Sequence, residues 1–360
     1  MRTNSQTFQE TLSIYQELIT RELKIFFEKE IQIAAAISPH AKLMVERLQE
    51  FTLRGGKRIR PILVIIGFQT CNSDVPLDKI LPVAISMELM QSFFLIHDDI
   101  IDEDILRRGK IAFHQFYATN NTYCNARHNV HFGESMGIVG GDIAAFLGTK
   151  LITESNFSQE TRLAALKLFQ EEVVKTCWGE MLDVLASQQK FSEQELTQIL
   201  DLKTAGYSFE TPLQLGRILA KKSSEEKDTL VHNVSIHLGR AFQLHDDILS
   251  IFGTEETIGK SIGNDIKEGK RTLLLLKTLE NASKEQQVFI EHCLGKNNLQ
   301  LEDVLRIREI MRTTGALDHI QTRAHQEQLV AKELIKNSKF LPEAKEFLTE
   351  LAEYVVDRKY

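Results

Sequence analysis

Residues 94–100 read FLIHDDI, and the same pattern returns 148 residues later as FQLHDDI over residues 242–248. Five of the seven positions are identical, which is well beyond casual coincidence. In the first copy, the apolar residues 93–96 lead directly into the acidic pair. We therefore expect the carboxylates to lie at the end of a buried helix, and the two copies to be equivalent helices of one fold.

The hydrophobic pattern outside these copies is also helical. Apolar residues recur every three or four positions, as in Leu12, Tyr15 and Ile19, and no alternating stretch exceeds a few residues. The chain has only six prolines, which break helix interiors. The sequence predicts an all-α protein with one main domain over residues 40–360 and an amphipathic helical extension over residues 1–39, separated at Ser38-Pro39. The longest predicted loops are residues 119–131 and 253–270.

Composition excludes several classes of protein. With 42% hydrophobic and 26% charged residues, the chain is not a disordered one. The net charge, 43 − 50 = −7, argues against nucleic acid as a partner. The four cysteines are widely spaced, the N-terminus has no apolar signal region, and no apolar run is long enough to cross a bilayer. We expect a cytoplasmic protein with no transmembrane segment and no disulfide framework.

Carboxylates crowd together at the end of both copies of the repeat. On a helix, Asp98 and Asp102 share a face one turn apart, with Asp99 offset by about 100°. Asp246 and Asp247 repeat this arrangement. Such carboxylates repel one another unless they are solvated or share a cation, and Mg²⁺ binds carboxylates together with substrate phosphates. One cluster alone would usually be a solvated helix face, but two clusters favour a magnesium site.

A histidine precedes each acidic pair, at His97 and His245. Metal ligation by these side chains is possible. On a helix, however, a residue directly before an aspartate points in another direction. We expect structural hydrogen bonds from both imidazoles.

Basic residues open the apolar segment that starts at residue 62. Residues 54–61 read RGGKRIRP, in which the two glycines allow a close backbone approach and the proline suits the first turn of a helix. Lys57, Arg58 and Arg60 offer donors to an anion at that helix start. A basic surface turn is the alternative reading of this stretch alone.

Further cations follow each acidic cluster. Arg107 and Arg108 begin five residues beyond Asp102. The cations that follow the second cluster, at longer range, are Lys260, Lys267, Lys270 and Arg271. A metal-bridged diphosphate requires metal ions on one side and Arg or Lys on the other, so the pattern predicts a diphosphate site.

Seven motifs in this order resemble those of the trans-isoprenyl diphosphate synthases, or polyprenyl synthetases, which are chain-elongating prenyltransferases. They are GGKRIRP at 55–61, DDIID at 98–102 followed by LRRG at 106–109, Gly141-Asp142, GEMLD at 179–183, Lys203-Thr204, FQLHDDI at 242–248, and Gly259-Lys260 with Asp265 and Gly269-Lys270. The resemblance covers roughly residues 55–271 and so places the catalytic domain in the main domain. It implies a single-domain isoprenoid-synthase-type helical bundle around a deep central cavity, three Mg²⁺ ions and a homodimer.

The resemblance also implies a role for individual residues. The implied metal ligands are Asp98, Asp102 and Asp246, with Asp99 and Asp247 supporting them in the same metal site. The implied isopentenyl diphosphate site consists of Lys57, Arg60, Gln91 and Arg108. The implied allylic diphosphate site consists of Arg107, Lys203, Gln243, Lys260 and Lys270. Thr204 and Lys203 would also lie near the developing allylic cation, so the expected catalytic set is Arg107, Lys203, Thr204 and Lys260.

The expected product is set by Phe93 and Phe94, five and four residues before Asp98. Their rings would close the floor of the cavity, although both rings could simply pack in the core. In the family, bulky residues at these positions mark short products. The resemblance therefore implies farnesyl diphosphate, with geranylgeranyl diphosphate as the alternative. Ser250 in place of a third aspartate, Glu180 in place of the usual glutamine, and the long N-terminal extension depart from the family pattern.

Three other functions compete with this one. A class I terpene cyclase would not need the basic residues of the isopentenyl diphosphate site. A metal phosphohydrolase with His-Asp pairs needs an isolated upstream histidine, and only His40 precedes His97. A non-catalytic subunit of a two-component prenyltransferase would usually lose the acidic clusters, and here only Ser250 points that way.

Overall fold

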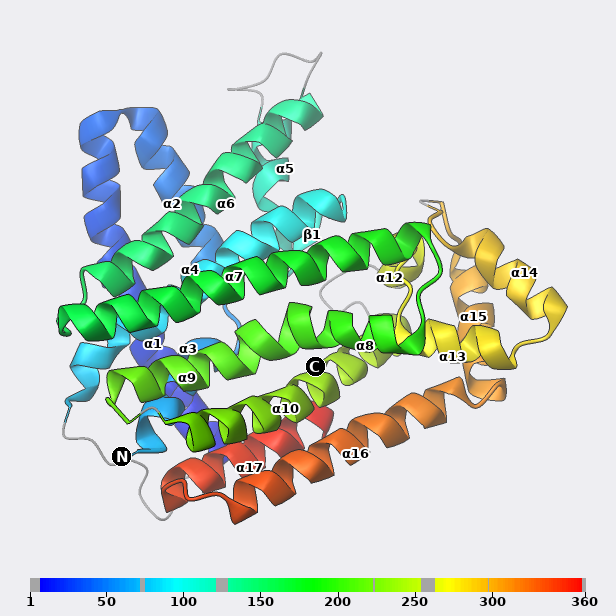
Figure 1. The fold of residues 1–360 in the computed structure, drawn as a ribbon. Helices are drawn as coiled ribbons and strands as arrows, with labels where there is room; N and C mark the ends of the chain where they lie inside the picture. Colours follow the sequence, from blue (N-terminus) through cyan, green and yellow to red (C-terminus); the bar gives the residue numbers. More distant parts are fainter. Residues whose placement is uncertain are drawn as a thin grey trace. The chain divides into compact units, whose positions relative to one another are not determined.

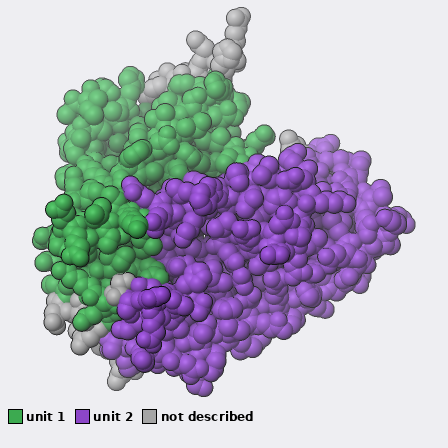
Figure 2. Space-filling model, viewed as in Figure 1, with its two compact units in different colours: residues 1–169, 212–222 green, residues 170–211, 223–360 purple. Residues whose placement is uncertain are grey.

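The computed structural model describes residues 7–71, 75–120, 129–222, 224–253, 263–296 and 298–357. The chain divides into two compact units, which Figure 2 colours separately. Unit 1 consists of Met1–Phe169 and Pro212–Lys222, and unit 2 of Gln170–Thr211 and Ser223–Tyr360. The predicted boundary between an extension and one main domain stays a prediction.

The all-α prediction is confirmed. Among the described residues the only strands are β1 (Leu106–Arg107) and β2 (Lys110–Ile111), which form one antiparallel pair. The other elements of unit 1 are α1 (Phe8–Ile37), α2 (Pro39–Leu53), α3 (Ile59–Gln69), α4 (Leu77–Ile101), α5 (Phe113–Thr119), α6 (Asn129–Thr153) and most of α9 (Thr211–Leu219). The long helix α7 (Gln159–Gln188) begins in unit 1 and ends in unit 2 (Figure 1).

Helix starts in unit 1 follow from local sequence. Thr7 and Glu10 form a capping box at the start of α1. The predicted break at Ser38-Pro39 is confirmed, because the Ser38 side chain caps α2 and Pro39 is its first residue. One face of α1 is buried, including Leu12, Ile19 and Leu23, and the helix packs on α2, α3 and α4. The amphipathic helix expected over residues 1–39 is therefore present.

The centre of unit 1 is α4, which packs most extensively against α6. Length and composition alone would let α4 and α6 cross a membrane. Within the most apolar stretch of each helix, 78% of α4 and 39% of α6 is buried inside the structure. The burial of α4 is that of a core helix, and the prediction of no transmembrane segment stays a prediction.

Unit 2 is built around α10 (Glu225–Phe252), which lies against α16 (Ala316–Asn337) in Figure 1. Its other elements are α8 (Glu193–Leu200), η1 (Asp201–Glu210), α12 (Asn264–Lys267), α13 (Leu273–Asn281), α14 (Lys284–Cys293), α15 (Leu301–Thr313) and α17 (Pro342–Asp357). The element η1 also packs on α10 and is a π-helix, which the sequence did not predict. Most of the two longest predicted loops, at residues 121–128 and 254–262, lies outside the described residues.

Candidate active site

The two copies of the repeat end two long helices, as predicted. FLIHDDI occupies the last two turns of α4, and FQLHDDI lies near the end of α10. The carbonyl end of a helix carries partial negative charge, which makes it an unfavourable place for carboxylates. The aspartates at the C-terminal ends of α4 and α10 therefore require compensating cations. The first cluster belongs to unit 1 and the second to unit 2.

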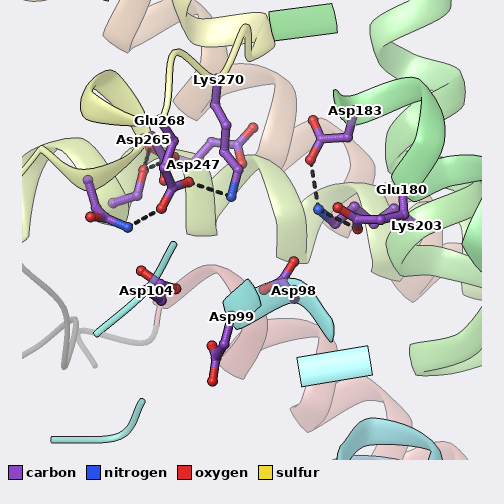
Figure 3. Close-up of polar contacts among 12 residues, drawn as sticks. Asp98, Asp99, Asp104, Glu180, Asp183, Lys203, Asp247, Asp265, Glu268 and Lys270 are labelled. Atoms are coloured by element: carbon purple, nitrogen blue, oxygen red, sulfur yellow. Dashed lines mark hydrogen bonds and ion pairs between the residues drawn. The ribbon is translucent and has the colours of Figure 1, made fainter. Parts of the chain in front are cut away.

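Among the described residues of unit 1, Arg107 supplies compensating positive charge. Its Nη2 lies 3.1 Å from Asp98 Oδ2 and 3.0 Å from Asp104 Oδ2, and the guanidinium also binds Asp99 Oδ1. Figure 3 labels these three aspartates. Asp104 was not predicted, since nothing in the sequence separates it from other surface acids. Arg107 was expected on an allylic diphosphate; in this structure it holds the acidic cluster together.

Asp99 is the unusual carboxyl of this cluster. Its side chain is 0% exposed, and its Oδ2 atom accepts no hydrogen bond from the described residues. Burial raises the pKa of Asp99 to about 7, although Arg107 acts in the opposite direction. A buried carboxyl oxygen without a donor suits a hard cation. The donor set of unit 1 therefore fits Mg²⁺, with Asp98 and Asp102 partly buried beside Asp99.

His97 has the structural role that was expected. Its Nε2 lies 3.2 Å from the carbonyl oxygen of Ile138 and 3.7 Å from the carboxylate of Asp142, both on α6. A Cβ at Gly141 would overlap the His97 ring. The Gly141-Asp142 motif is thereby explained, because the glycine admits the imidazole and the aspartate faces it.

The basic turn before α3 is only partly as predicted. Gly55 and Gly56 have φ angles of 97° and 107°, and Arg108 Nη1 donates to the Gly55 carbonyl. The expectation that Arg58 offers a donor to an anion is wrong. Arg58 is 4% exposed and forms an ion pair with Glu88, which is also 4% exposed. Its positive charge is therefore paired with a buried carboxylate inside unit 1.

The other predicted cations of unit 1 remain near the surface or around a small pocket. Lys57 is exposed, and Arg60 is half-buried at the start of α3. Gln91, Arg107 and Arg108 line one small pocket. The remaining residues of its lining are Phe51, Thr52, Arg54, Glu88, Ser92 and Leu95. The structure thus brings together Gln91 and Arg108, two of the residues assigned to isopentenyl diphosphate.

Phe93 and Phe94 lie one turn before the first acidic cluster, and both are half-buried in unit 1. Their ring centroids are 4.8 Å apart, and the Phe93 ring also meets the His97 ring edge-on at 4.8 Å. The pair is therefore anchored to the same histidine that precedes the aspartates. Their expected role in closing a cavity floor stays a prediction.

In unit 2 a hydrogen-bonded chain joins η1 to the second acidic cluster. Thr204 Oγ1 donates to Gln243 Oε1 at 2.7 Å, and Gln243 Nε2 donates to Asp247 Oδ1 at 2.9 Å. Thr204 is 5% exposed and Asp247 is 6% exposed. Three predicted site residues from two separate motifs, Lys203-Thr204 and FQLHDDI, are thus one connected group.

Lys203 is the second predicted site residue on η1. Its Nζ lies 2.7 Å from Asp183 Oδ2 and 2.8 Å from Glu180 Oε2, as Figure 3 shows. Both acids belong to the GEMLD stretch, now part of α7. Glu180 was noted in the sequence only as a departure from the family pattern. It and Asp183 hold the lysine whose charge was assigned to the allylic diphosphate.

Asp247 is the counterpart of Asp99. Burial raises its pKa to about 8, and the nearby Asp265, Asp246 and Asp183 act in the same direction, against the hydrogen bond from Gln243. Asp246 is half-buried beside it. This surplus of carboxylates again fits a divalent cation, which would favour their charged forms.

The segment after α10 adds two more acids. Asp265 accepts a hydrogen bond from Ser250 Oγ, and Glu268 binds Lys270 Nζ at 2.8 Å (Figure 3). Lys270 was assigned to the allylic diphosphate and here pairs with an acid that the sequence did not single out. Lys260 lies outside the described residues.

Comparisons with known proteins agree with this arrangement. The family profile of polyprenyl synthetases matches residues 41–311. The short chain isoprenyl diphosphate synthase of Methanothermobacter thermautotrophicus is 32% identical over 307 residues, which are 85% of this chain and 87% of the relative. The geranylgeranyl diphosphate synthase of Methanosarcina mazei is 28% identical over 307 residues, again 85% of this chain and 87% of the relative.

The fold is also that of a solved structure. The geranylgeranyl pyrophosphate synthase of Corynebacterium glutamicum, crystallised with isoprenyl diphosphate and magnesium, matches with a TM-score of 0.90 at 31% identity, over 96% of this chain and 98% of that one. The expected isoprenoid-synthase-type fold is confirmed. The chain therefore belongs to the polyprenyl synthetase family and is an isoprenyl diphosphate synthase, a prenyltransferase.

Proposed function

We propose that the chain condenses isopentenyl diphosphate with the allylic substrates dimethylallyl and geranyl diphosphate, and that farnesyl diphosphate is the main product. The observation that carries the proposal is the crowding of carboxylates at the C-terminal ends of α4 and α10. Each cluster includes one buried aspartate, Asp99 in unit 1 and Asp247 in unit 2. Burial raises the pKa of both carboxyl groups. Such groups are costly unless the enzyme binds cations there.

Mg²⁺ is the cofactor that these donors suit. In unit 1 the ligands would be Asp98, Asp99 and Asp102, and in unit 2 they would be Asp246 and Asp247. Three ions are expected when substrate is bound. When present, the ions supply positive charge to the oxygens of the allylic diphosphate. The magnesium in the Corynebacterium structure supports this assignment by analogy.

The cations of this chain divide between the two substrates. Isopentenyl diphosphate would bind Lys57, Arg60, Gln91 and Arg108. The allylic diphosphate would bind Lys203, Gln243, Lys260, Lys270 and, after release from its aspartates, Arg107. The second group would place donors on the allylic diphosphate, where negative charge grows as this leaving group departs. The first group would hold isopentenyl diphosphate, which keeps its own diphosphate.

The reaction follows from these proposed roles. The allylic C–O bond ionises because its diphosphate is held by cations, so no nucleophile from the protein is needed. The double bond of isopentenyl diphosphate then attacks the allylic cation, and the released diphosphate accepts the proton. Lys203 and Thr204, both on η1, would lie near the developing cation and fix its orientation.

Farnesyl diphosphate is proposed because Phe93 and Phe94 put two rings one turn before the metal ligands. Geranylgeranyl diphosphate is the second candidate. It is supported by the names of the Methanosarcina and Corynebacterium relatives, both geranylgeranyl diphosphate synthases. We also keep the cytoplasm as the proposed location.

A homodimer is part of the proposal. In unit 2, α7 exposes an apolar stripe at helical spacing, formed by Val174, Trp178, Met181 and Leu185, each at least 40% exposed. Monomeric proteins rarely leave a large apolar patch uncovered. A second copy of the chain is the occupant expected from the family.

The experiment that tests the proposal uses the purified chain alone. Isopentenyl diphosphate is supplied with dimethylallyl diphosphate, with and without Mg²⁺, and products are identified by mass spectrometry. We expect linear products that require Mg²⁺. Inactivity without a partner protein would support the non-catalytic subunit, and cyclic products or simple hydrolysis would support the other two alternatives.

A further inference from the structure

The π-helix η1 carries Lys203 and Thr204, and its backbone is held by α7. A π-helix has a wider turn than an α-helix, is rare, and occurs mostly at functional sites. It also changes the direction in which the following residues point. The conformation of these ten residues therefore decides where Lys203 Nζ lies.

Glu172 of α7 lies directly against the middle of η1. A Cβ at Gly206 would overlap Glu172 Oε1, so the carboxyl group occupies the space that any larger residue at position 206 would need. Glu172 is 2% exposed, and its Oε1 accepts no hydrogen bond within the described part of the chain. Its nearest counter-charge, Lys175 Nζ, is 3.7 Å from Oε2.

This carboxyl group is costly for folding. Burial raises the pKa of Glu172 to about 7, with Lys175 opposing and Glu210 of η1 adding to the effect. An apolar side chain of the same length would avoid the cost of the unsatisfied oxygen. Buried groups of this kind that lower stability often serve function instead.

Two turns further along α7, a second close contact lies at Lys203 itself. A Cβ at Gly179 would come within 2.7 Å of the Lys203 backbone nitrogen. Beside it, Glu180 and Asp183 bind Lys203 Nζ. The Glu172–Gly206 contact and the Gly179–Lys203 contact thus fix η1 on α7 at two points, with the functional lysine at one of them.

We propose that Glu172 is a positioning residue, whose contact with Gly206 keeps η1 in its wide-turn form and so places Lys203 for the allylic diphosphate. The inference rests on the proposed role of Lys203. It concerns only the orientation of the allylic substrate, and the residues assigned to isopentenyl diphosphate belong to unit 1.

The test compares four single variants. Glu172→Ala removes the carboxyl, Gly206→Ala forces it away, Glu172→Gln keeps its shape, and Glu171→Ala is a matched control at an exposed acid of the same helix. We expect Glu172→Ala and Gly206→Ala to lower kcat by about 10- to 100-fold, the effect of a misplacement near 1 Å, with the KM for isopentenyl diphosphate changed less than about twofold. Glu172→Gln and the control should retain kcat within about twofold.

Two combinations separate positioning from simple packing. In the double variant Glu172→Ala with Gly206→Ala, the new methyl group takes the space of the carboxyl, and kcat should recover relative to Gly206→Ala. In a Lys203→Ala background, Glu172→Ala should lower kcat no further.

Full additivity of Glu172→Ala and Lys203→Ala would overturn the inference, as would unchanged kcat in both Glu172→Ala and Gly206→Ala. If Lys203→Ala by itself leaves kcat unchanged, the proposed role of Lys203 fails first, and the inference fails with it. If Glu172→Ala does not fold, the Gly206→Ala and Glu172→Gln variants carry the same comparison.

Discussion

The buried ion pair between Arg58 and Glu88 leads to a direct prediction about the stability of unit 1. Both residues are 4% exposed, and Arg58, with a left-handed φ of 51°, directly precedes α3. The two residues are 30 positions apart in the chain and join the basic turn to α4. Removing Glu88 leaves the Arg58 charge buried without its ion-pair partner, and removing Arg58 leaves buried Glu88 with the more exposed Arg108 nearby.

The size of the effect follows from that burial. Breaking a buried ion pair by removing one partner costs about 3–5 kcal/mol, whereas replacing both partners by apolar residues is often nearly neutral. We expect Glu88→Gln and Arg58→Met each to lower the free energy of unfolding by about 3–5 kcal/mol. The double variant Arg58→Met with Glu88→Leu should lose less than either single variant.

Equilibrium unfolding in urea measures these values, because the free energy of unfolding falls linearly with denaturant concentration. A surface ion pair serves as the control. Lys110 and Glu50 are 3.1 Å apart with side chains 60% and 33% exposed, so Lys110→Met should cost about 1 kcal/mol or less. A loss in Glu88→Gln no larger than in Lys110→Met would refute the reasoning, as would a double variant whose loss equals the sum of the two single losses.

Four further predictions concern the proposed site, the dimer and Glu172. Asp98→Ala or Asp246→Ala should lower kcat by about 100-fold or more while circular dichroism stays unchanged, since each removes a proposed metal ligand; unaltered turnover would contradict that assignment. Phe93→Ala should lengthen the product, as read by mass spectrometry, and an identical product mixture would exclude the floor role. Trp178→Asp should convert a dimer into a monomer in analytical ultracentrifugation, and an unchanged sedimentation coefficient would argue against the α7 stripe as interface. Burial raises the pKa of Glu172 from 4.5 to about 7, so its neutral form stabilises the fold below pH 4.5 and this stability is lost as the pH rises through 7. A glutamine at this position does not titrate. Between pH 5 and pH 8 the free energy of unfolding of Glu172→Gln, relative to that of the native chain, should therefore rise by roughly 2–3 kcal/mol, at 1.36 kcal/mol per pKa unit.

The sequence predicted the elements whose pattern is local. The apolar residues 93–96 and the acids after them give the end of α4, and Ser38-Pro39 gives the start of α2, because burial, capping and proline geometry act within one or two turns. The motifs also predicted site residues at Lys203, Thr204 and Gln243, and the structure places Thr204 in contact with Gln243. What no motif contained was the link between Thr204 and Gln243, which are 39 residues apart and meet through the packing of η1 on α10.

Other features depended on partners far along the chain. Arg58 looks like a phosphate donor from its neighbours in GGKRIRP, and only the fold brings Glu88 to it. The π-helical turn of η1 also could not be predicted from the sequence, because the hydrophobic pattern of ten residues does not distinguish its period from that of an α-helix. Gly206 was the available signal: a glycine inside a helical pattern often marks a close approach.

The effect of Ser250 on the second acidic cluster becomes clear only when the sequence and the structure are considered together. Taken alone, a serine where the family has aspartate removes a carboxylate from the second cluster. In the folded chain, however, the Ser250 hydroxyl donates to Asp265, and Asp265 in turn helps raise the pKa of Asp247. A carboxylate 15 residues downstream is thus held beside the position where the third aspartate is missing. Because a cation responds to where negative charge lies and not to which helix supplies it, the substitution leaves the acidic character of this end of α10 in place.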